Sequence, residues 1–227
     1  MTENALILLS GGLDSAVSLY WALSQSWNAS TIELEYHQRP SRERSACFDL
    51  RKHAGISDAH AIVVPLDFVR EVTDLPEGAL VNTSLSQAPQ GYIPSRNLVF
   101  YSLCSYYAEI LGIRYIVGGH NRGDSESFPD AGRFFFRRLN QVLELAMWSY
   151  SQTHTEILLP LIEYGKAEVL RLGYSLGVPF ELTWSCYHDA ERPCGDCESC
   201  TERRDAFAEV GFPDPLMASG TIPFSPG

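Results

Sequence analysis

Short apolar runs alternate along the chain with longer stretches in which apolar residues recur every three or four positions. A short continuous apolar run is typical of a strand buried in a parallel sheet, and recurrence at three and four positions is typical of a helix. The pattern predicts strands over 5–9, 31–37, 60–66, 114–119 and 156–161. It predicts helices over 16–23, 42–55, 97–112, 130–150 and 166–177. This alternation predicts an α/β fold with a doubly wound parallel sheet of the Rossmann type and right-handed crossovers.

Several polar segments follow the predicted strands directly. In sheets of this kind, ligands bind at the carboxyl ends of the strands. The segments at such ends are SGGLDS at 10–15, YHQR at 36–39, the loop before Asn97 and GGHNRGD at 118–124. Residues 66–90 are rich in Pro, Ser, Asp and Gly and have no clear period, which predicts a long functional or mobile loop. A role of this loop as a lid is a hypothesis.

The segment SGGLDS joins the first predicted strand to the first predicted helix. A glycine turn at a helix N-terminus directs backbone N–H groups and the positive end of the helix dipole to one point, which suits a phosphate. Ser10 and Ser15 add hydroxyl donors, whereas Asp14 repels a phosphate unless a divalent cation lies between them. The combination predicts a site for metal-bound ATP. A tight turn with a serine N-cap is the structural alternative.

The composition narrows the class of substrate. The chain has 227 residues and a net charge of −11, from 17 Lys and Arg against 28 Asp and Glu. This length suits one α/β domain with a small appendage. The negative charge disfavours a large nucleic-acid surface, because such binding depends on lysine and arginine. The first residues carry no basic n-region and the apolar runs are too short to span a bilayer, so we expect a soluble, cytoplasmic protein that acts on a small molecule and not on a membrane.

Four of the six cysteines cluster near the C-terminus with the spacing C-x7-C-x2-C-x2-C. They are Cys186, Cys194, Cys197 and Cys200. Four thiolates enclose one tetrahedral Zn²⁺ and leave no open position, so we expect a structural zinc site. An iron–sulfur cluster, a redox CxxC pair and free buried cysteines are the alternatives. Cys47 and Cys104 lie on predicted helices and are expected in the core.

The cysteine cluster also suggests how the chain is organised. We expect residues 1–183 to form an ATP-binding and catalytic domain. Residues 184–227 then form a zinc-binding helical segment that packs on this domain.

Several segments in a common order resemble the 7-cyano-7-deazaguanine synthase family of PP-loop ATP pyrophosphatases. The segments are SGGLDS, YHQR, PSRNLVF at 94–100, PL followed by GKAE, TWSCY and CGDCESC. The resemblance covers nearly the whole chain and implies the adenine nucleotide alpha hydrolase type of the fold. It implies an ATP-dependent carbon–nitrogen ligase of the queuosine pathway, which converts 7-carboxy-7-deazaguanine and ammonia to 7-cyano-7-deazaguanine through an adenylate and an amide. The implied cofactors are ATP, Mg²⁺ and Zn²⁺, and family members commonly form homodimers.

The resemblance implies which residues make up the site. The expected nucleotide-binding residues are Ser10, Gly11, Gly12, Leu13, Asp14 and Ser15. The expected catalytic residues are Asp14, Arg96 and Lys166. The expected substrate-binding residues are Tyr36, Gln38, Arg39, Arg96, Asp124, Phe128 and Asp130. No covalent nucleophile is required, because fixed cations and N–H groups lower the barrier where charge develops. Solvated surface charges are the alternative for Arg96 and Lys166.

The segment DSESFPDAGRFFF at 124–136 departs from the usual family pattern, D-x-SG-YPDCR-x-EF. Ala131 stands at the cysteine position and Phe134 at the glutamate position. The aromatic ring of Phe128 and the carboxylate of Asp130 are retained and still suit a guanine-like base. A proline turn is the structural alternative for FPD.

Other functions stay open as hypotheses. One is an enzyme that couples the adenylated carboxylate to another amine, on a protein, DNA or a small molecule. A tRNA-thiolating enzyme, an asparagine-synthase-like amidotransferase and a non-catalytic nucleotide-binding module also stay open.

Overall fold

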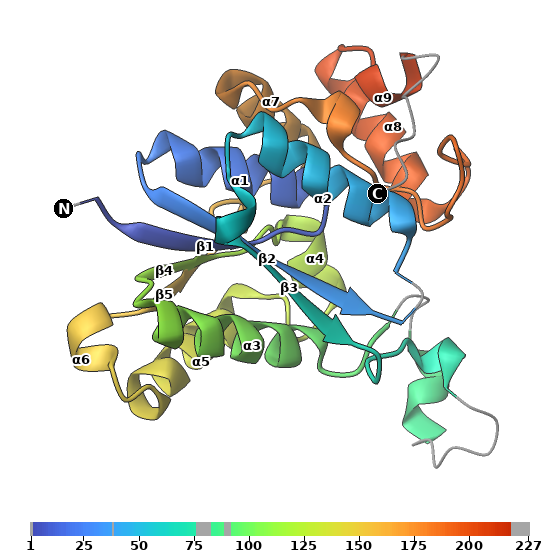
Figure 1. Ribbon diagram of the computed structural model, residues 1–227. Coiled ribbons are helices and arrows are strands. Elements are labelled where there is room, and N and C mark those ends of the chain that lie inside the picture. Colours follow the sequence, from blue (N-terminus) through green and yellow to red (C-terminus); the bar gives the residue numbers. More distant parts are fainter. Residues whose placement is uncertain (1, 38, 76–82, 89–91, 219–227) are drawn as a thin grey trace.

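The structure, a computed structural model, describes residues 2–37, 39–75, 83–88 and 92–218. Within these residues the strands form one parallel sheet in the order β3-β2-β1-β4-β5 (Figure 1). The strands are β1 (Asn4–Leu8), β2 (Asn28–Tyr36), β3 (Ala61–Leu66), β4 (Tyr115–Val117) and β5 (Glu156–Leu158). The predicted doubly wound parallel sheet is therefore confirmed.

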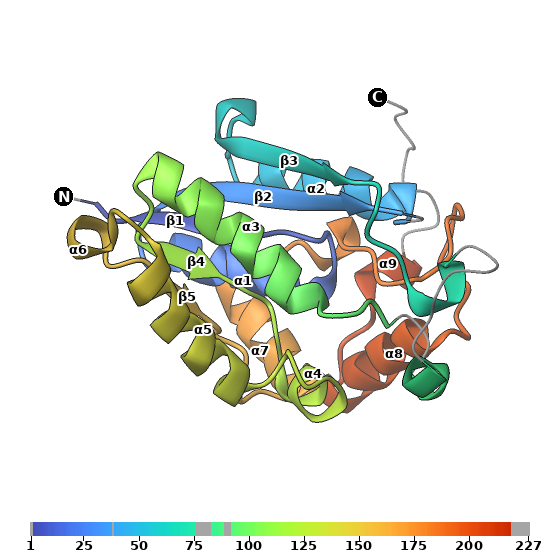
Figure 2. The same ribbon diagram turned by 90° about the horizontal axis from the view of Figure 1, so that it is seen from below.

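Helices cover both faces of the sheet (Figures 1 and 2). One face packs against α1 (Leu13–Ser24), α2 (Ser41–His53), α7 (Lys166–Leu176) and α8 (Glu198–Val210). The other face packs against α3 (Arg96–Leu111) and α5 (Arg133–Ala146). The shorter helices are α4 (Arg122–Ser127), α6 (Tyr150–Thr153) and α9 (Pro215–Ala218), with single 3₁₀ turns at Asp58–His60, Val72–Asp74, Thr83–Gln87 and Phe180–Leu182.

The alternation of side chains along β1 explains why its sequence is apolar throughout. Ala5 and Ile7 lie in the cluster with α1 and α7, whereas Leu6 lies in the cluster with α3 and α5. All three side chains are completely buried. A strand that is buried on both faces has no polar side, so its pattern is a continuous apolar run.

The order of the strands creates a crevice at one end of the sheet. From β1 the chain proceeds to β2 and β3 on one side, and β4 and β5 are added on the other side. Strand β1 therefore pairs with both β2 and β4, through partners such as Leu8 with Ile32 and Ile7 with Val117. The loops that leave the carboxyl ends of β1 and β4 diverge to opposite faces, and ligands of open α/β sheets bind at such a switch point.

The prediction of one helix over 130–150 is wrong. Helix α5 ends at Ala146, because Met147 is extended and turns its side chain into the core. The next residues are held by α3, since the carboxylate of Glu109 accepts hydrogen bonds from the backbone N–H of Ser149 at 2.9 Å and from its hydroxyl at 3.2 Å. The chain then forms the short helix α6.

Two other segments differ from the expected pattern. Helix α4 was not expected, although Asn121 and Asp124 form a capping box at its start, with spacing that the sequence shows. The expected long loop at 66–90 contains the 3₁₀ turns Val72–Asp74 and Thr83–Gln87. Residues 76–82 and 89–91 lie outside the described residues, so the lid hypothesis stays a prediction.

The C-terminal segment packs on the body of the protein through a small apolar cluster. Trp184, Cys186, Cys200 and Leu216 are buried together against Ala46 of α2. Within the described part of the chain, no helix is both long enough and apolar enough to cross a membrane.

Candidate active site and metal site

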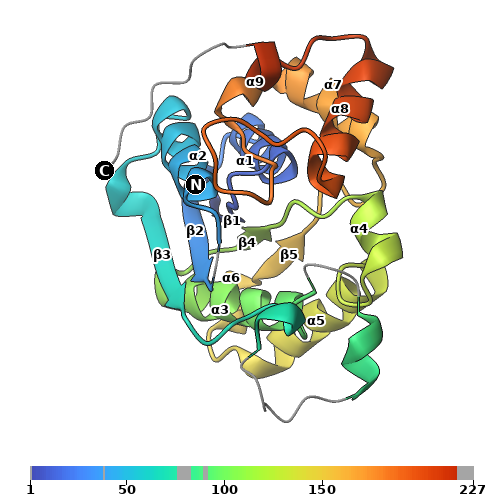
Figure 3. The ribbon, with the colours of Figure 1, turned by 90° about the vertical axis from the view of Figure 1, so that its right-hand side faces the viewer.

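The carboxyl ends of the strands open into a cleft of about 1380 Å³. Figure 3 shows this end of the sheet, with α4, α8 and the segment before α8 arranged around it. Most of the expected site residues line the cleft, although they come from five separate segments. They are Ser10, Gly12, Asp14, Ser15, Tyr36, Arg39, Arg96, Asp124, Phe128 and Lys166. Gln38 lies outside the described residues.

The turn before α1 is fixed in one conformation by its neighbours. Gly11 has a φ of +87°, and a Cβ there would lie 2.4 Å from the backbone oxygen of Glu43, so only glycine fits. The Ser15 hydroxyl donates to the Gly12 carbonyl at 3.0 Å and accepts from the Ser10 N–H at 3.2 Å. The Leu13 side chain is buried in the core. Of the expected residues Gly11, Gly12 and Leu13, only Gly12 lines the cleft among the described residues.

Asp14 and Lys166 form an ion pair at the mouth of this turn. The Lys166 ammonium lies 2.7 Å from Asp14 Oδ2, and the Asn121 amide donates to Asp14 Oδ1 at 3.3 Å. Burial lowers the pKa of the Lys166 ammonium, but the Asp14 carboxylate outweighs it and the net shift is upward. Lys166 is therefore a fixed cation at the first turn of α7.

A second carboxylate lies close to Asp14. Burial, and then repulsion from Asp14, raise the pKa of Asp124. The Gly119 backbone packs closely against the start of α1, because a Cβ there would lie 2.9 Å from the Ser15 nitrogen. Backbone N–H groups, one lysine and two carboxylates suit a phosphate that is bound together with a divalent cation.

An aromatic wall forms the other side of the cleft. The rings of Tyr92 and Phe128 are nearly parallel, with centroids 6.5 Å apart, and the Arg96 guanidinium lies 5.7 Å from the Phe128 ring centroid. The Asp130 carboxylate accepts a hydrogen bond from the Asn97 N–H at 2.9 Å. Asp130 therefore caps α3, and the described residues that line the cleft do not include it.

Arg39 supports the site from beneath. Its guanidinium donates to the Ser10 carbonyl at 2.8 Å and to the Glu43 carboxylate at 3.1 Å, and it also pairs with Glu35. Only 6% of Arg39 is exposed.

Tyr36 lines the cleft beside Arg39. Burial, and then the nearby Glu43 carboxylate, raise the pKa of Tyr36 to about 12, so its hydroxyl stays protonated at neutral pH.

Sequence reasoning missed several residues that line the cleft. Asn97, Tyr101 and His120 lie at its floor, and Tyr187 and Glu202 reach it from the C-terminal segment. Burial, and then the charge of Arg96, lower the pKa of His120 to about 3, so the imidazole is neutral. The segment GGHNRGD was correctly placed at a strand end, but nothing in its pattern distinguishes His120. Helical spacing on α3 makes Tyr101 look like an ordinary core residue.

The four clustered cysteines form a compact metal-binding geometry. Their sulfurs all lie within 4.8 Å of one another, with Cys186 and Cys194 at 3.5 Å and Cys194 and Cys200 at 3.9 Å. A tetrahedral site with zinc–sulfur bonds of about 2.3 Å has edges of about 3.8 Å, so the cluster fits one ion. Backbone N–H groups of His188 and Cys194 each donate to the Cys186 sulfur at 3.4 Å. Cys47 and Cys104 are completely buried, as expected for core residues.

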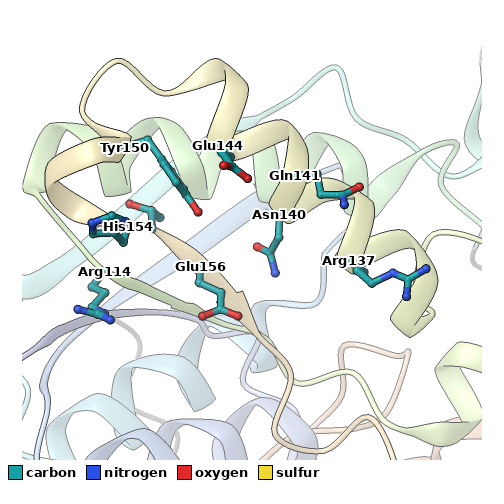
Figure 4. Close-up of a pocket in the computed structure, with 9 residues that line it drawn as sticks. Arg114, Arg137, Asn140, Gln141, Glu144, Tyr150, His154 and Glu156 are labelled. Carbon is teal, nitrogen blue, oxygen red and sulfur yellow. The ribbon is translucent and has the colours of Figure 1, made fainter.

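A second hollow, of about 620 Å³, lies at the opposite end of the sheet (Figure 4). It is lined by Arg114 and Glu156, which lie at the amino ends of β4 and β5, and by residues of α5 and α6. It contains none of the residues expected from the sequence. The cleft at the carboxyl ends of the strands, and not this hollow, therefore contains most of the residues expected from the sequence.

The parallel sheet, the SGGLDS turn and the four-cysteine cluster define an α/β protein of the PP-loop type, the class of ATP-using adenine nucleotide alpha hydrolase-like proteins. The U34-tRNA thiolase NcsA from Methanococcus maripaludis shares this fold, with a TM-score of 0.51 and 16% identity over 92% of this chain and 65% of that chain. A 4-thiouridine synthetase in complex with RNA and ATP has a TM-score of 0.50 and 15% identity over 92% of this chain and 50% of that chain. At these identities only the fold is shared.

Sequence comparison identifies the family. The family model of queuosine biosynthesis protein QueC matches residues 4–211. The 7-cyano-7-deazaguanine synthase of Trichodesmium erythraeum is 36% identical over 94% of this chain and 100% of its own length. The 7-cyano-7-deazaguanine synthase of Thermoplasma acidophilum is 35% identical over 94% of this chain and 91% of its own length. The chain belongs to the QueC family.

Proposed function

We propose that the protein is an ATP-dependent carbon–nitrogen ligase that converts 7-carboxy-7-deazaguanine and ammonia to 7-cyano-7-deazaguanine. The observation that carries the proposal is the match of nearly the whole chain to 7-cyano-7-deazaguanine synthases. The geometry of the cleft supports it, because the phosphate-type turn and the aromatic wall face one space. In the proposed arrangement the nucleotide and the deazaguanine meet at the switch point of the sheet.

The turn before α1 is the proposed seat of the ATP phosphates. Backbone N–H groups of residues 10–15 and the hydroxyls of Ser10 and Ser15 supply the donors. Asp14 is the proposed carboxylate for Mg²⁺, which proteins usually hold through one or two carboxylates and the substrate phosphates. Lys166 then exchanges its contact with Asp14 for a phosphate oxygen.

The proposed reaction consumes two molecules of ATP. A carboxylate oxygen of the substrate bonds to the α-phosphorus and pyrophosphate leaves, which gives the acyl adenylate. The nitrogen of ammonia then bonds to the acyl carbon, and AMP and a proton leave, which gives the amide. The amide oxygen bonds to the α-phosphorus of a second ATP, pyrophosphate leaves with a proton, and loss of AMP and another proton gives the nitrile. Arg96 and Lys166 stabilise the charge on the phosphates in both rounds.

The aromatic wall is the proposed seat of the deazaguanine ring. Phe128 offers a flat face for the ring, and Asp124 is the proposed acceptor for its donor edge. Asp130 contributes indirectly in this proposal, because its bond to the Asn97 N–H fixes the start of α3 and with it Arg96. Arg39 contributes by holding the Ser10 carbonyl. The altered segment at 131–134 is compatible with this use, since Ala131 is buried and Phe134 is 68% exposed.

The cysteine cluster is proposed to hold Zn²⁺ as a structural ion, in a C-terminal segment 184–227 that packs on a catalytic body 1–183. Residues 219–227 of this segment lie outside the described residues. Four sulfur ligands leave no position for substrate. The segment supports the nucleotide site directly, because the Trp184 N–H donates to the Gly11 carbonyl at 2.9 Å. It also caps α2, since the Asp189 carboxylate accepts hydrogen bonds from the backbone N–H groups of Ser41 at 3.2 Å and Arg42 at 3.3 Å. The consumption of ATP makes the cytoplasm the proposed location.

A homodimer is part of the proposal. Helices α3 and α5 lie on the same side of the molecule (Figure 2). Their outer side chains include Tyr106, Ile110 and Val142, each more than half exposed, and Trp148 beyond α5 is 97% exposed. An apolar surface of this kind is typical of an interface, and sedimentation analysis tests the dimer.

The reaction is tested by mass spectrometry after incubation of the protein with ATP, Mg²⁺, ammonium and 7-carboxy-7-deazaguanine. We expect 7-cyano-7-deazaguanine and AMP. Lys166→Met should abolish AMP formation, and Lys52→Met, which changes an exposed lysine on α2, should not. AMP with an accumulated adenylate or amide would indicate a different acceptor or end product. An absence of AMP from folded, metal-loaded protein would refute the proposal.

A further inference from the structure

Two buried polar groups on α3, in residues that line the cleft, have no hydrogen-bond partner among the described residues. They are the Asn97 amide nitrogen Nδ2 and the Tyr101 hydroxyl. Both residues line the cleft, although Asn97 is only 3% exposed and Tyr101 is completely buried. Residues four positions apart lie on the same face of a helix, so the two groups belong to one surface.

The surrounding packing is adapted to the Tyr101 hydroxyl. A Cβ on Gly118 would lie 1.7 Å from this oxygen, so the glycine at the end of β4 leaves the space that the hydroxyl fills. The Tyr101 ring is held edge-on by Phe136, with centroids 4.7 Å apart, and lies 5.7 Å from the His120 ring. A buried polar group without a partner destabilises the folded state. A rigidly held one on the wall of a cleft is typical of a group that binds a ligand.

The two groups lie between the phosphate turn and the aromatic wall. Gly119 follows Gly118 directly, and it lies so close to the start of α1 that an added Cβ would be 2.9 Å from the Ser15 nitrogen. On the other side, Arg96 precedes Asn97 and lies over the Phe128 ring. A substrate whose ring packs on Phe128 and whose carboxylate reaches the α-phosphate has its acyl group between these two regions.

We propose that the Asn97 amide and the Tyr101 hydroxyl bind the acyl oxygen of the substrate. The inference rests on the proposed function and adds two substrate-contacting residues to it. The oxygen in question is the one that does not bond to phosphorus when the adenylate forms. It is charged in the free carboxylate and becomes charged again when ammonia adds to the acyl carbon, and an N–H and an O–H donor stabilise both states. Because both donors are neutral, they release the amide product more readily than a fixed cation does.

The test compares the wild-type protein with Tyr101→Phe and Asn97→Leu, which remove the polar atoms and keep most of the volume. Tyr107→Phe, a partly buried tyrosine of α3 that does not line the cleft, is the matched control. The first readout is equilibrium binding of 7-carboxy-7-deazaguanine and of 7-deazaguanine, which has no acyl group. We expect the wild-type protein and Tyr107→Phe to prefer the carboxylate. Each cleft variant should lose about 10- to 100-fold of that preference, as expected for a hydrogen bond to a charged group, with little change for 7-deazaguanine.

Turnover and stability provide two further readouts. We expect Tyr101→Phe to lower kcat by about 10-fold or more and to leave the affinity for ATP unchanged. Its thermal midpoint should equal or exceed that of the wild-type protein, since an unpaired buried hydroxyl has been removed. A residue with only a structural role would lower stability and activity together. If Asn97→Leu does not fold, Tyr101→Phe still decides the question.

The outcomes separate this inference from the proposed function. If the wild-type protein forms AMP and nitrile but Tyr101→Phe behaves like Tyr107→Phe in binding and turnover, the inference is overturned and the function stands. If the wild-type protein forms no AMP, the proposed function fails, and the binding comparison still decides whether these groups bind the acyl oxygen. A wild-type protein that binds the two compounds equally, or binds neither, also overturns the inference.

Discussion

Replacement of Gly118 by alanine should destabilise the protein through a single, identifiable clash. The added Cβ would lie 1.7 Å from the Tyr101 hydroxyl, whereas ordinary contact begins at 3.4 Å, so the oxygen must retreat by about 1.7 Å. The Tyr101 ring is completely buried and cannot retreat without displacing Phe136. Overpacking of this kind costs about 1–3 kcal/mol, and we expect about 3 kcal/mol here. For a chain of this length, that lowers the thermal midpoint by about 6–12 °C.

The clash predicts that Gly118→Ala and Tyr101→Phe are not additive. Without the hydroxyl, the nearest atoms to the new Cβ are Tyr101 Cζ at 2.9 Å and Leu159 Cδ2 at 3.0 Å, which need shifts of a few tenths of an ångström. Gly118→Ala should therefore cost only about 1 kcal/mol in the Tyr101→Phe background, which leaves a coupling free energy of about 2 kcal/mol. Urea unfolding followed by circular dichroism measures the free energy of unfolding of the wild-type protein, the two single variants and the double variant.

A control separates this clash from the general effect of adding a methyl group. A Cβ on Gly132 would meet its nearest atoms at 3.8 and 4.0 Å, so Gly132→Ala causes no clash and should cost at most about 1 kcal/mol, because alanine is a poorer N-cap of α5 than glycine. Additivity of the Gly118 and Tyr101 substitutions within about 0.5 kcal/mol would refute the reasoning. A Gly118→Ala protein as stable as the wild type would refute it as well.

Three other parts of the structure give predictions. Arg203→Met should lower the free energy of unfolding by about 3–5 kcal/mol in urea titrations, because it leaves the buried Asp214 carboxylate unpaired, whereas Arg204→Met at an exposed position should have little effect. Elemental analysis should find one zinc per chain. A chelator should remove the zinc and lower the thermal midpoint. The Cys47→Ala variant should keep its zinc, since Cys47 lies apart from the cluster. The pKa of His120 falls from 6.5 in the unfolded chain to about 3 in the folded protein, through burial and then a neighbouring arginine. The unfolded chain therefore binds more protons between these values, and the free energy of unfolding should fall as pH drops from 6.5 towards 3, by at most about 5 kcal/mol. His120→Gln should flatten this pH dependence, and an unchanged slope would contradict the assignment.

The fold was largely predictable because its signals are local. The central strand β1 is buried on both faces and is visible as an apolar run, and the connecting helices show their own period. The failure at 130–150 has the opposite cause. The apolar spacing continues past Ala146, and the helix ends there because Glu109, 40 residues earlier, captures the Ser149 N–H. An interaction over that distance leaves no trace in the local pattern.

The candidate site was predictable where a motif has chemistry of its own. The residue types of SGGLDS are typical of a phosphate-binding turn, and four cysteines at short spacing can hold a metal ion wherever the backbone allows them to meet. For these two features, the structure adds distances to a prediction that the sequence already supports. The meeting of Asp14 and Lys166, 152 positions apart, follows from the topology of the parallel sheet and was anticipated only through resemblance.

What only the tertiary structure decided is how identical residue types are used. Arg39 and Arg96 look equivalent in the sequence, yet Arg39 is enclosed by carboxylates beneath the phosphate turn, whereas Arg96 faces the cleft beside Phe128. The resemblance implies that Asp130 binds the base, and in the structure its carboxylate caps α3. The spacing on α3 predicts a core position for Tyr101, but the residue lines the cleft and its buried hydroxyl has no partner among the described residues. Residue type sets which bonds a side chain can make, and the sheet and its loops determine which partners come within reach, because a hydrogen bond forms only within about 3 Å.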